Sequence, residues 1–377
     1  RSRSVGEPAL DRFTRTTMNR SQDRPTPKLV PDGKVSPYLV RRIRKGDVVR
    51  LGEVEGTFTL PKPIPDKMVF ISAGSGITPI ISMLRSLEYS YWLTLALAVP
   101  TAGFLIRLFI IQHDCGHGNF FKSRRVRDWV GRAIGTLLLT PYDYWRKAHA
   151  YHHAHSGDLD FRGFGDVDTI TVDEYYALTR LQRFQYRIYR HPLVLFGVGP
   201  AYQFLIKHRY PTDAPREWTQ AWRSVWWTNV AIAGVVAVMW LTIGIENFLL
   251  VQLPVTLIGS TLGVWMFYVQ HQFEETYWHW HDGWDYYDAS LLGSSYLVLP
   301  APLQWITGNI GVHHVHHMSA RIPNYKLQQA HDENEEFHVV TKVRFRATLK
   351  LINLSLWDEE NQQLIRFRDL KKLRNAV

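Results

Sequence analysis

Long apolar stretches dominate the last three quarters of the chain. Three of them, at 89–112, 226–245 and 248–270, carry almost no charge and reach the roughly 20 residues that a membrane-spanning helix needs. Only Glu246 and Asn247 separate the last two, which predicts a hairpin. We therefore expect a mainly α-helical, membrane-embedded fold with three spans. The shorter apolar segments at 133–141 and 192–206 are expected to be interfacial or re-entrant.

The N-terminal region follows a different pattern. Residues 1–27 are rich in Arg, Ser, Thr and Pro and are predicted to be disordered. In residues 28–88 short apolar runs alternate with Gly and Pro, which predicts a small β-rich unit that ends in a short helix. Residues 89–355 form the predicted membrane domain, and residues 356–377 form a predicted basic C-terminal tail.

Composition and charge support a membrane location. The chain has 14 Trp, 18 Tyr and 18 Phe, which suits wide membrane interfaces, and its net charge is +10. Basic residues flank the apolar stretches but are absent from the hairpin tip, so the flanks are predicted to be cytoplasmic. No nucleic-acid-binding module is recognisable. The single cysteine, Cys115, excludes an intrachain disulfide framework and a four-cysteine iron–sulfur cluster.

Eight of the 17 histidines form three clusters on the predicted cytoplasmic side. Within a cluster they lie three or four residues apart, so a helix would present all of its imidazoles toward one point. Eight imidazoles exceed what one metal ion binds, so we expect two ions, with redox-active iron suited to oxygen chemistry and zinc to hydrolysis. The clustered residues are His113, His117, His149, His152, His153, His313, His316 and His317.

Other polar residues are weaker candidates. His271 ends the third apolar stretch and is expected to be a ninth ligand, whereas Asn309 is not. Five aspartates could orient a ligand imidazole, although helix capping or a place in a solvated loop is the commoner role for each; they are Asp114, Asp143, Asp158, Asp166 and Asp168. The histidines expected to lie in an aromatic belt or at the surface are His279 and His281, and His155, His191, His208, His331 and His338.

The three clusters lie in recognisable motifs. Residues 113–121, the run His-Ala-Tyr-His-His at 149–153, and residues 307–325 resemble the bacterial membrane fatty acid desaturases, of the kind that includes Δ12 (omega-6) enzymes. The resemblance covers about residues 89–355. It implies a four-span helical protein with a cytosolic di-iron centre held by the eight clustered histidines. Such an enzyme inserts a double bond into a long acyl chain of a lipid or thioester, using dioxygen and two electrons from a donor such as ferredoxin.

Residues 28–88 resemble a second family, the ferredoxin–NADP reductase type of flavoprotein. Gly33 and Ser36 lie in a segment similar to its flavin loop. Gly74, Gly76 and Thr78 lie in a segment similar to the turn that opens its NADP-binding half. The fragment is truncated, and one βα unit cannot build a dinucleotide site, so we expect no useful binding of FAD or NADP.

The desaturase-like part has one span fewer than the family. A fusion of two truncated pieces would explain this, as would a re-entrant loop broken at Pro100 and Gly103. We expect a multi-pass protein of the bacterial inner membrane with its metal site on the cytoplasmic face. The alternatives are a hydroxylase or ketolase of alkanes or carotenoids on the same scaffold, a non-catalytic fusion, and a loose metal-sequestering tract.

Overall fold

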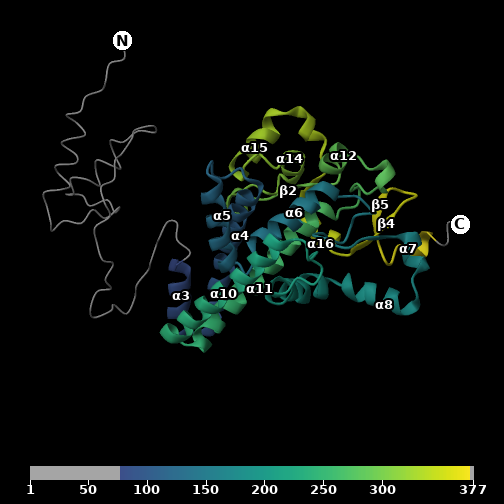
Figure 1. Ribbon diagram of the computed structural model, residues 1–377. Coiled ribbons are helices and arrows are strands. Elements are labelled where there is room, and N and C mark those ends of the chain that lie inside the picture. The colour runs from purple at the N-terminus through teal and green to yellow at the C-terminus, as the bar shows by residue number, and fades with distance from the viewer. Residues whose placement is uncertain (1–76, 374–377) are drawn as a thin grey trace, which may run out of the picture. The chain divides into compact units, whose positions relative to one another are not determined.

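The computed structural model describes residues 77–373, which are mainly helical (Figure 1). The helices are α3 (Ile77–Leu87), α4 (Tyr91–His117), α5 (Arg124–Leu137), α6 (Tyr142–His155), α7 (Val172–Ala177), α8 (Arg180–Tyr189), α9 (Gly199–Leu205), α10 (Thr219–Ile243), α11 (Ile245–His271), α12 (Tyr286–Leu291), α13 (Ala301–Ile306), α14 (His313–Met318), α15 (Asn324–Glu333), α16 (Thr348–Leu351) and α17 (Leu370–Leu373). The strands are β1 (Ile170–Thr171), β2 (Tyr296–Val298), β3 (Lys342–Arg344), β4 (Leu354–Asp358) and β5 (Gln363–Arg366). The segment predicted to be disordered, 1–27, and most of the reductase-like segment lie outside the described residues.

Three helices within residues 77–373 are long and apolar enough to cross a membrane, which confirms the predicted number of spans. They are α4, α10 and α11, and α10 and α11 run side by side as a hairpin in Figure 1. The predicted hairpin link was misplaced, because Glu246 and Asn247 lie in the first turn of α11. The link is Gly244, whose φ of 81° is readily adopted only by a residue without a Cβ.

Helix α4 is continuous, so the alternative of a re-entrant loop is wrong. Pro100 lies inside this helix of 27 residues. Proline removes one backbone donor, and in membrane helices neighbouring side chains can satisfy the freed groups. Here the Thr101 hydroxyl donates to the Leu97 carbonyl at 2.7 Å. The helix ends at Gly118, which has a left-handed φ of 84° and donates its N–H to the Asp114 and Cys115 carbonyls.

Helix α3 packs against α4 and α11. Met83 is fully buried in a cluster with Ala98 of α4 and Val251 of α11. The Ser86 and Thr94 hydroxyls are 2.7 Å apart, and either can be the donor. The boundary predicted between residues 88 and 89 therefore falls inside one packed helical unit.

The C-terminal segment also belongs to the core. Strand β4 pairs in parallel with β1 and antiparallel with β5. All five residues of β4 are buried, and Trp357 is only 1% exposed. The predicted boundary at residue 356 thus falls inside a strand, and the segment through β5 is not a free tail. Strands β2 and β3 form a second, parallel pair.

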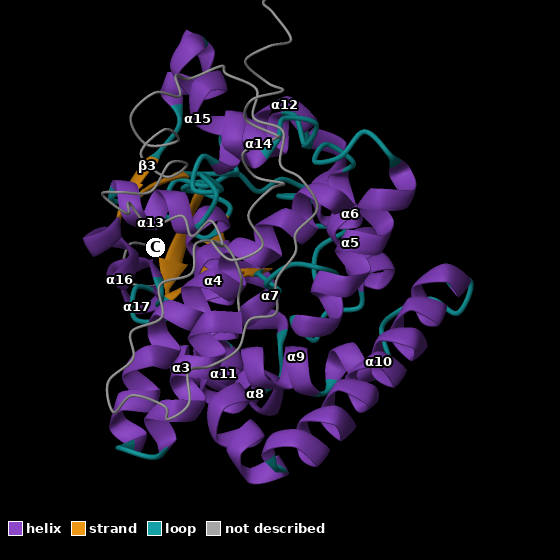
Figure 2. Cartoon of the chain, turned by 90° about the vertical axis from the view of Figure 1, so that its left-hand side faces the viewer, coloured by secondary structure: helices purple, strands orange, loops and turns teal. Residues whose placement is uncertain are grey.

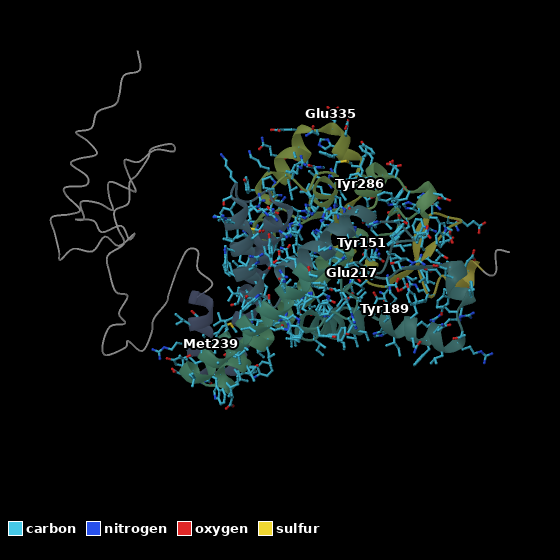
Figure 3. The ribbon with its side chains drawn as sticks, viewed as in Figure 1. Tyr151, Tyr189, Glu217, Met239, Tyr286 and Glu335 are labelled. Atoms are coloured by element: carbon cyan, nitrogen blue, oxygen red, sulfur yellow. The ribbon has the colours of Figure 1, made fainter. Side chains whose placement is uncertain are left out.

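The two short apolar segments do not cross the structure as spans. The first overlaps the end of α5, a helix that exposes Val126, Trp129 and Leu137. The second forms a π-helical turn at Val194–Val198 followed by α9, near α8 and α11 in Figure 2. In Figure 3, Met239 lies near the hairpin tip and Glu335 lies at the opposite end of the described residues. The histidine clusters lie where α4 and α11 end, away from the tip.

Candidate metal centre

Nine buried or half-buried histidines form two groups in the described part of the chain. Within each group the candidate ligand atoms all lie within 4.8 Å of one another. The first group comprises His113, His117, His149, His153 and His316. The second comprises His152, His271, His313 and His317. Both groups take residues from α6 and α14, so they are neighbours, as the 4.2 Å between the His153 and His317 ring centroids also indicates.

Helical geometry explains how one motif serves two groups. Successive residues of an α-helix are rotated by about 100°, so positions i and i+4 differ by about 40° while i+3 and i+4 differ by about 100°. In α6, His149 and His153 point into the first group and His152 into the second. In α14, His313 and His317 point into the second and His316 into the first. The expectation that each cluster converges on one point was wrong for α6 and α14, because i+3 diverges, and it holds for His113 and His117 of α4.

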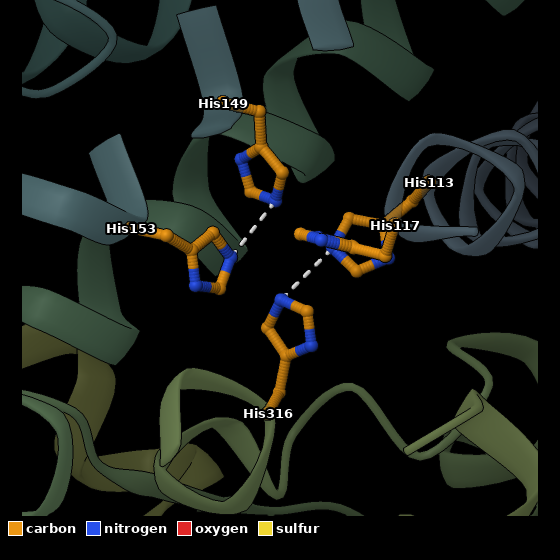
Figure 4. A group of neighbouring side chains, drawn as sticks. All are labelled: His113, His117, His149, His153 and His316. Carbon is orange, nitrogen blue, oxygen red and sulfur yellow. Dashed lines mark hydrogen bonds between the residues drawn. The ribbon is translucent and has the colours of Figure 1, made fainter. Parts of the chain in front are cut away.

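The first group is drawn in Figure 4. The rings of His113, His117, His149, His153 and His316 point toward a common centre between α4, α6 and α14. The Nε2 atoms of His113 and His316 are 3.0 Å apart, and those of His149 and His153 are 3.2 Å apart. Zinc–imidazole bonds of about 2.0–2.1 Å, for comparison, place two ligand nitrogens about 3–4 Å apart.

The second group is more fully buried than the first. All four of its residues are buried, and the Nε2 atoms of His271 and His313 are 2.9 Å apart. His271 is the last residue of α11, so the end of a span delivers it to the group. The structure therefore brings the ninth histidine named from the sequence to the other eight.

The groups are suited to a metal because burial keeps most of their imidazoles neutral and several ring nitrogens lack other partners. Burial lowers the pKa of His149, His316 and His317 well below the ordinary value, and neighbouring imidazoles lower it further. At neutral pH each ring then keeps a lone pair for a ligand. Among the described residues, no hydrogen-bond partner meets the buried Nε2 atoms of His117, His152 or His317. Buried polar atoms without partners are rare in proteins, and a bound ion satisfies them.

Hydrogen bonds orient several of these rings from behind. Asp114 Oδ1 lies 3.0 Å from His113 Nδ1, and its Oδ2 accepts from the backbone N–H and side-chain amide of Asn324 at 2.7 and 2.8 Å. His271 Nδ1 lies 3.1 Å from the Gly293 carbonyl. Such contacts fix the tautomer and leave Nε2 to face the group. Asp166 Oδ2 lies 3.5 Å from His152 Nδ1, which is within ion-pair distance but forms no hydrogen bond.

Comparison with known proteins identifies the family to which the chain belongs. The family model described as fatty acid desaturase matches residues 90–347, which span both histidine groups and all three long apolar helices. The chain belongs to the fatty acid desaturase family. This desaturase is 46% identical over 288 residues to a Bacillus subtilis protein named fatty acid desaturase, covering 76% of this chain and 81% of that protein.

Two cyanobacterial relatives are more distant. A Synechocystis protein named sn-1 oleoyl-lipid 12-desaturase is 25% identical over 320 residues, which are 82% of this chain and 86% of the relative. A second Synechocystis protein, named sn-1 acyl-lipid omega-3 desaturase (ferredoxin), is 28% identical over 229 residues, which are 59% of this chain and 62% of the relative. The match to acyl desaturases thus extends over most of the helical unit.

A cavity of about 370 Å³ adjoins the histidine groups of the desaturase. Its volume lies in the range of about 300–1,000 Å³ that is usual for ligand pockets. His113, His149 and His313 lie on its wall, and Trp145 lines it beside them. The remaining wall is largely apolar and comes mainly from α4, α9 and α11, with Leu105, Ile106, Phe109, Leu195, Phe204, Val264, Met266 and Phe267 among its residues.

Trp145 was not singled out from the sequence. Its ring stacks on His149 with centroids 4.7 Å apart and planes at 18°. A Cβ at Gly116 would come within 2.9 Å of the same indole, so the absence of a side chain there lets the indole pack against α4. The signal in the sequence was Gly116 itself, which stands between the ligand candidates His113 and His117.

The other polar candidates lie apart from the groups. The Asn309 amide donates to the Asn324 carbonyl. Asp143 accepts from Arg132 and Arg146, and Asp158 pairs with the exposed His281. The backbone N–H of Asp168 donates to the Tyr189 hydroxyl, and its carbonyl accepts from Tyr186.

Two histidines predicted at the surface are buried. His208 is 3% exposed and lies between Gln203 and the Leu139 carbonyl. His331 is 3% exposed, and its Nδ1 lies 3.1 Å from His314 Nε2. Tertiary packing buries both, which the local sequence does not reveal.

Of the five reductase-like residues named from the sequence, the structure describes only Thr78. Gly33, Ser36, Gly74 and Gly76 lie outside the described residues. Thr78 lies in the first turn of α3.

Proposed function

We propose that this chain is an acyl desaturase with one iron ion in each histidine group. The observation that carries the proposal is the sharing of α6 and α14 between the two groups, which brings them side by side at one wall of an apolar cavity. His113, His117, His149, His153 and His316 would hold one ion, and His152, His271, His313 and His317 the other. When bound, such an iron pair supplies the oxidising power to remove two hydrogens from an unactivated chain, using dioxygen and two electrons.

Family membership, more than the donor set, favours iron over a hydrolytic zinc pair. Imidazole suits several transition metals, so the ligands alone leave iron, zinc, copper and nickel open. Membership of the desaturase family favours a redox metal.

The substrate is a long acyl chain that occupies the cavity. The apolar side chains of α4 and α11 provide the wall that a hydrocarbon needs, and Trp145 holds the His149 ring against it. Two relatives are named for acyl-lipid substrates, which supports a lipid-linked acyl chain, and one is named a 12-desaturase, which supports a Δ12-like outcome.

The membrane placement and the electron donor belong to the same proposal. The basic residues that flank the spans support a cytoplasmic metal site in a bacterial inner membrane. A relative named with ferredoxin supports a small electron carrier of that kind as partner. The reductase-like fragment is proposed to bind neither FAD nor NADP.

Expression of the whole chain in a desaturase-deficient bacterium tests the function. We expect a new unsaturated fatty acid by mass spectrometry and about two iron ions per purified chain, in line with two histidine groups. His153→Ala and His271→Ala should abolish the product and lower the iron content. His338→Ala is the matched control, because His338 lies outside both groups and should leave both readouts unchanged.

Two results would contradict the proposal. An acid that persists in His153→Ala would refute iron binding by the first group. A product that gains an oxygen atom, instead of losing two hydrogens, would favour the hydroxylase or ketolase alternative.

A further inference from the structure

We infer that Gly263 on α11 sets how long an acyl chain the cavity accepts, by leaving open the part of the cavity that receives the methyl end. The inference rests on the proposed function, since it assigns a selectivity residue to the proposed substrate cavity. It depends on three observations: the face of α11 that lines the cavity, the open space at Gly263, and a polar part of the cavity wall at Gln203, Lys207 and Asp213.

One face of α11 lines the cavity over much of its length. The lining positions recur every three or four residues, as expected for one helical face. The face ends at Gln270, one residue before His271 of the second histidine group. The lining residues of α11 are Thr256, Gly259, Ser260, Gly263, Val264, Met266, Phe267 and Gln270.

Of the two glycines on this face, Gly263 is the exposed one, at which a side chain would meet empty space. A Cβ built there has no atom within 4 Å, although the residue lines the cavity. At Gly259, one turn earlier, a Cβ would lie 3.8 Å from Ala102 and Leu105, which is ordinary contact with α4. A larger residue at 263 would therefore enter the cavity without displacing protein atoms, whereas one at 259 would press on α4.

The distance between Gly263 and the second histidine group is suited to the methyl end of an acyl chain. Gly263 precedes His271 by eight residues, which is about 12 Å along a helix that rises about 1.5 Å per residue. Gly263 thus lies two turns deeper in the span than the second histidine group. A side chain there would block the hydrocarbon beyond the site of reaction and leave the histidines untouched.

A polar part of the cavity wall indicates which end of the substrate lies at Gly263. Gln203, Lys207 and Asp213 also line the cavity, and Lys207 Nζ and Asp213 Oδ2 form an ion pair of 2.6 Å. The side chains of this pair are 25% and 30% exposed, so this wall meets solvent or the interface. A polar headgroup or thioester fits there, and the methyl end fits the apolar wall at Gly263.

The test compares Gly263→Leu with Gly234→Leu in the full-length chain. Gly234 is a matched control, because it lies in span α10, is exposed, and also has no atom within 4 Å of a built Cβ. Both variants are expressed in a desaturase-deficient host that contains palmitoyl and stearoyl lipids. The readouts are the unsaturated products of each chain length, the iron content and the thermal midpoint.

Gly263→Leu should raise the ratio of shorter to longer products by about tenfold or more, because one misfitting methylene in an apolar pocket changes discrimination by about 10–200-fold. Gly263→Ala should change the ratio in the same direction by less. Gly234→Leu should leave it unchanged. If Gly263→Leu does not fold, the direction in which Gly263→Ala changes the product ratio tests the inference instead.

An unchanged ratio in folded, iron-containing Gly263 variants would overturn the inference, and so would an equal loss of activity on both chain lengths. Failure of the proposed function looks different. In that case the unmodified chain itself makes no unsaturated acid from either lipid.

Discussion

At the scale of single residues, the surroundings of a histidine determine its role. His149 has a neutral ring that joins four others, whereas His281 is exposed and pairs with Asp158. His208 shows a third environment. It is buried away from both groups, and its Nε2 lies 3.0 Å from the Gln203 amide nitrogen. That amide can only donate, so the contact requires an unprotonated Nε2.

We predict that His208 makes the protein sensitive to acid. Burial, and then the charge of Arg209, lower the pKa of His208 to about 3. In the unfolded chain the imidazole titrates near its ordinary value of about 6.5. Between these values the unfolded state binds more protons, so the free energy of unfolding falls as the pH falls through this window, by at most about 1.4 kcal/mol per unit from this residue.

Thermal midpoints of the protein and of His208→Gln measure this contribution. The variant should lose less stability between about pH 7 and pH 5, because it has no imidazole to protonate. His191→Gln is the control, since His191 is exposed and its replacement should not alter the pH dependence. Parallel pH profiles for the protein and His208→Gln would refute the prediction.

At the scale of elements, close helix packing positions the histidines. Helix α6 carries three of the nine and is held against α5 by Tyr142, which is fully buried. A Cβ at Gly131 of α5 would lie 2.3 Å from the Tyr142 ring. The side chain of Arg146 covers the same ring, with its guanidinium carbon 5.3 Å from the centroid. The ring therefore has little room to yield.

We predict that Gly131→Ala loosens this contact and destabilises the protein. Overpacking of a buried contact costs about 1–3 kcal/mol in the free energy of unfolding. Thermal unfolding followed by tryptophan fluorescence measures the change, and iron content reports whether α6 still presents its histidines. Gly234→Ala should act in the opposite direction, because Ala favours a helix over Gly by about 1 kcal/mol and the site is open. Equal midpoints for the two variants would contradict the packing argument.

At the scale of the whole molecule, segments near both ends of the described residues complete the core. Trp357 of β4 is buried, and the Leu354 carbonyl accepts from Arg190 at 2.8 Å and from the Tyr268 hydroxyl at 2.7 Å. These contacts join the last strands to α11 three residues before His271. Helix α3 similarly buries Met83 against α4 and α11.

We predict that an N-terminal truncation lowers the stability of the protein more when it removes α3 than when it stops before α3. Removal of residues 1–88 deletes α3 and exposes the apolar surface that Met83 covers on Ala98 and Val255. Loss of a buried Met side chain alone costs about 2–5 kcal/mol. Removal of residues 1–76 keeps α3 and should leave a higher thermal midpoint and more iron per chain. Equal midpoints for the two truncated chains would show that α3 does not stabilise the helical unit.

Much of the site was predictable because its signals are local. The length of an apolar run decides whether a helix can cross a membrane, and histidine spacing decides which rings a helix can bring to one side. The nine histidines and the three spans were accessible for that reason. The roles of Trp145 and the Gly293 carbonyl were not, because each depends on a partner from elsewhere in the fold. Asp114 was one of five candidate aspartates, and the Asn324 contact that holds it was not visible in the sequence.

By itself the sequence determined the element types and the kind of chemistry, since apolar length and side-chain type act within a few residues. Only the tertiary structure decided that the motifs of α6 and α14 each divide between two groups, that His271 joins the second, and that β4 and β5 belong to the core. The reason is physical: the direction of a side chain about its helix is a local property, but what it meets depends on which helices pack beside it.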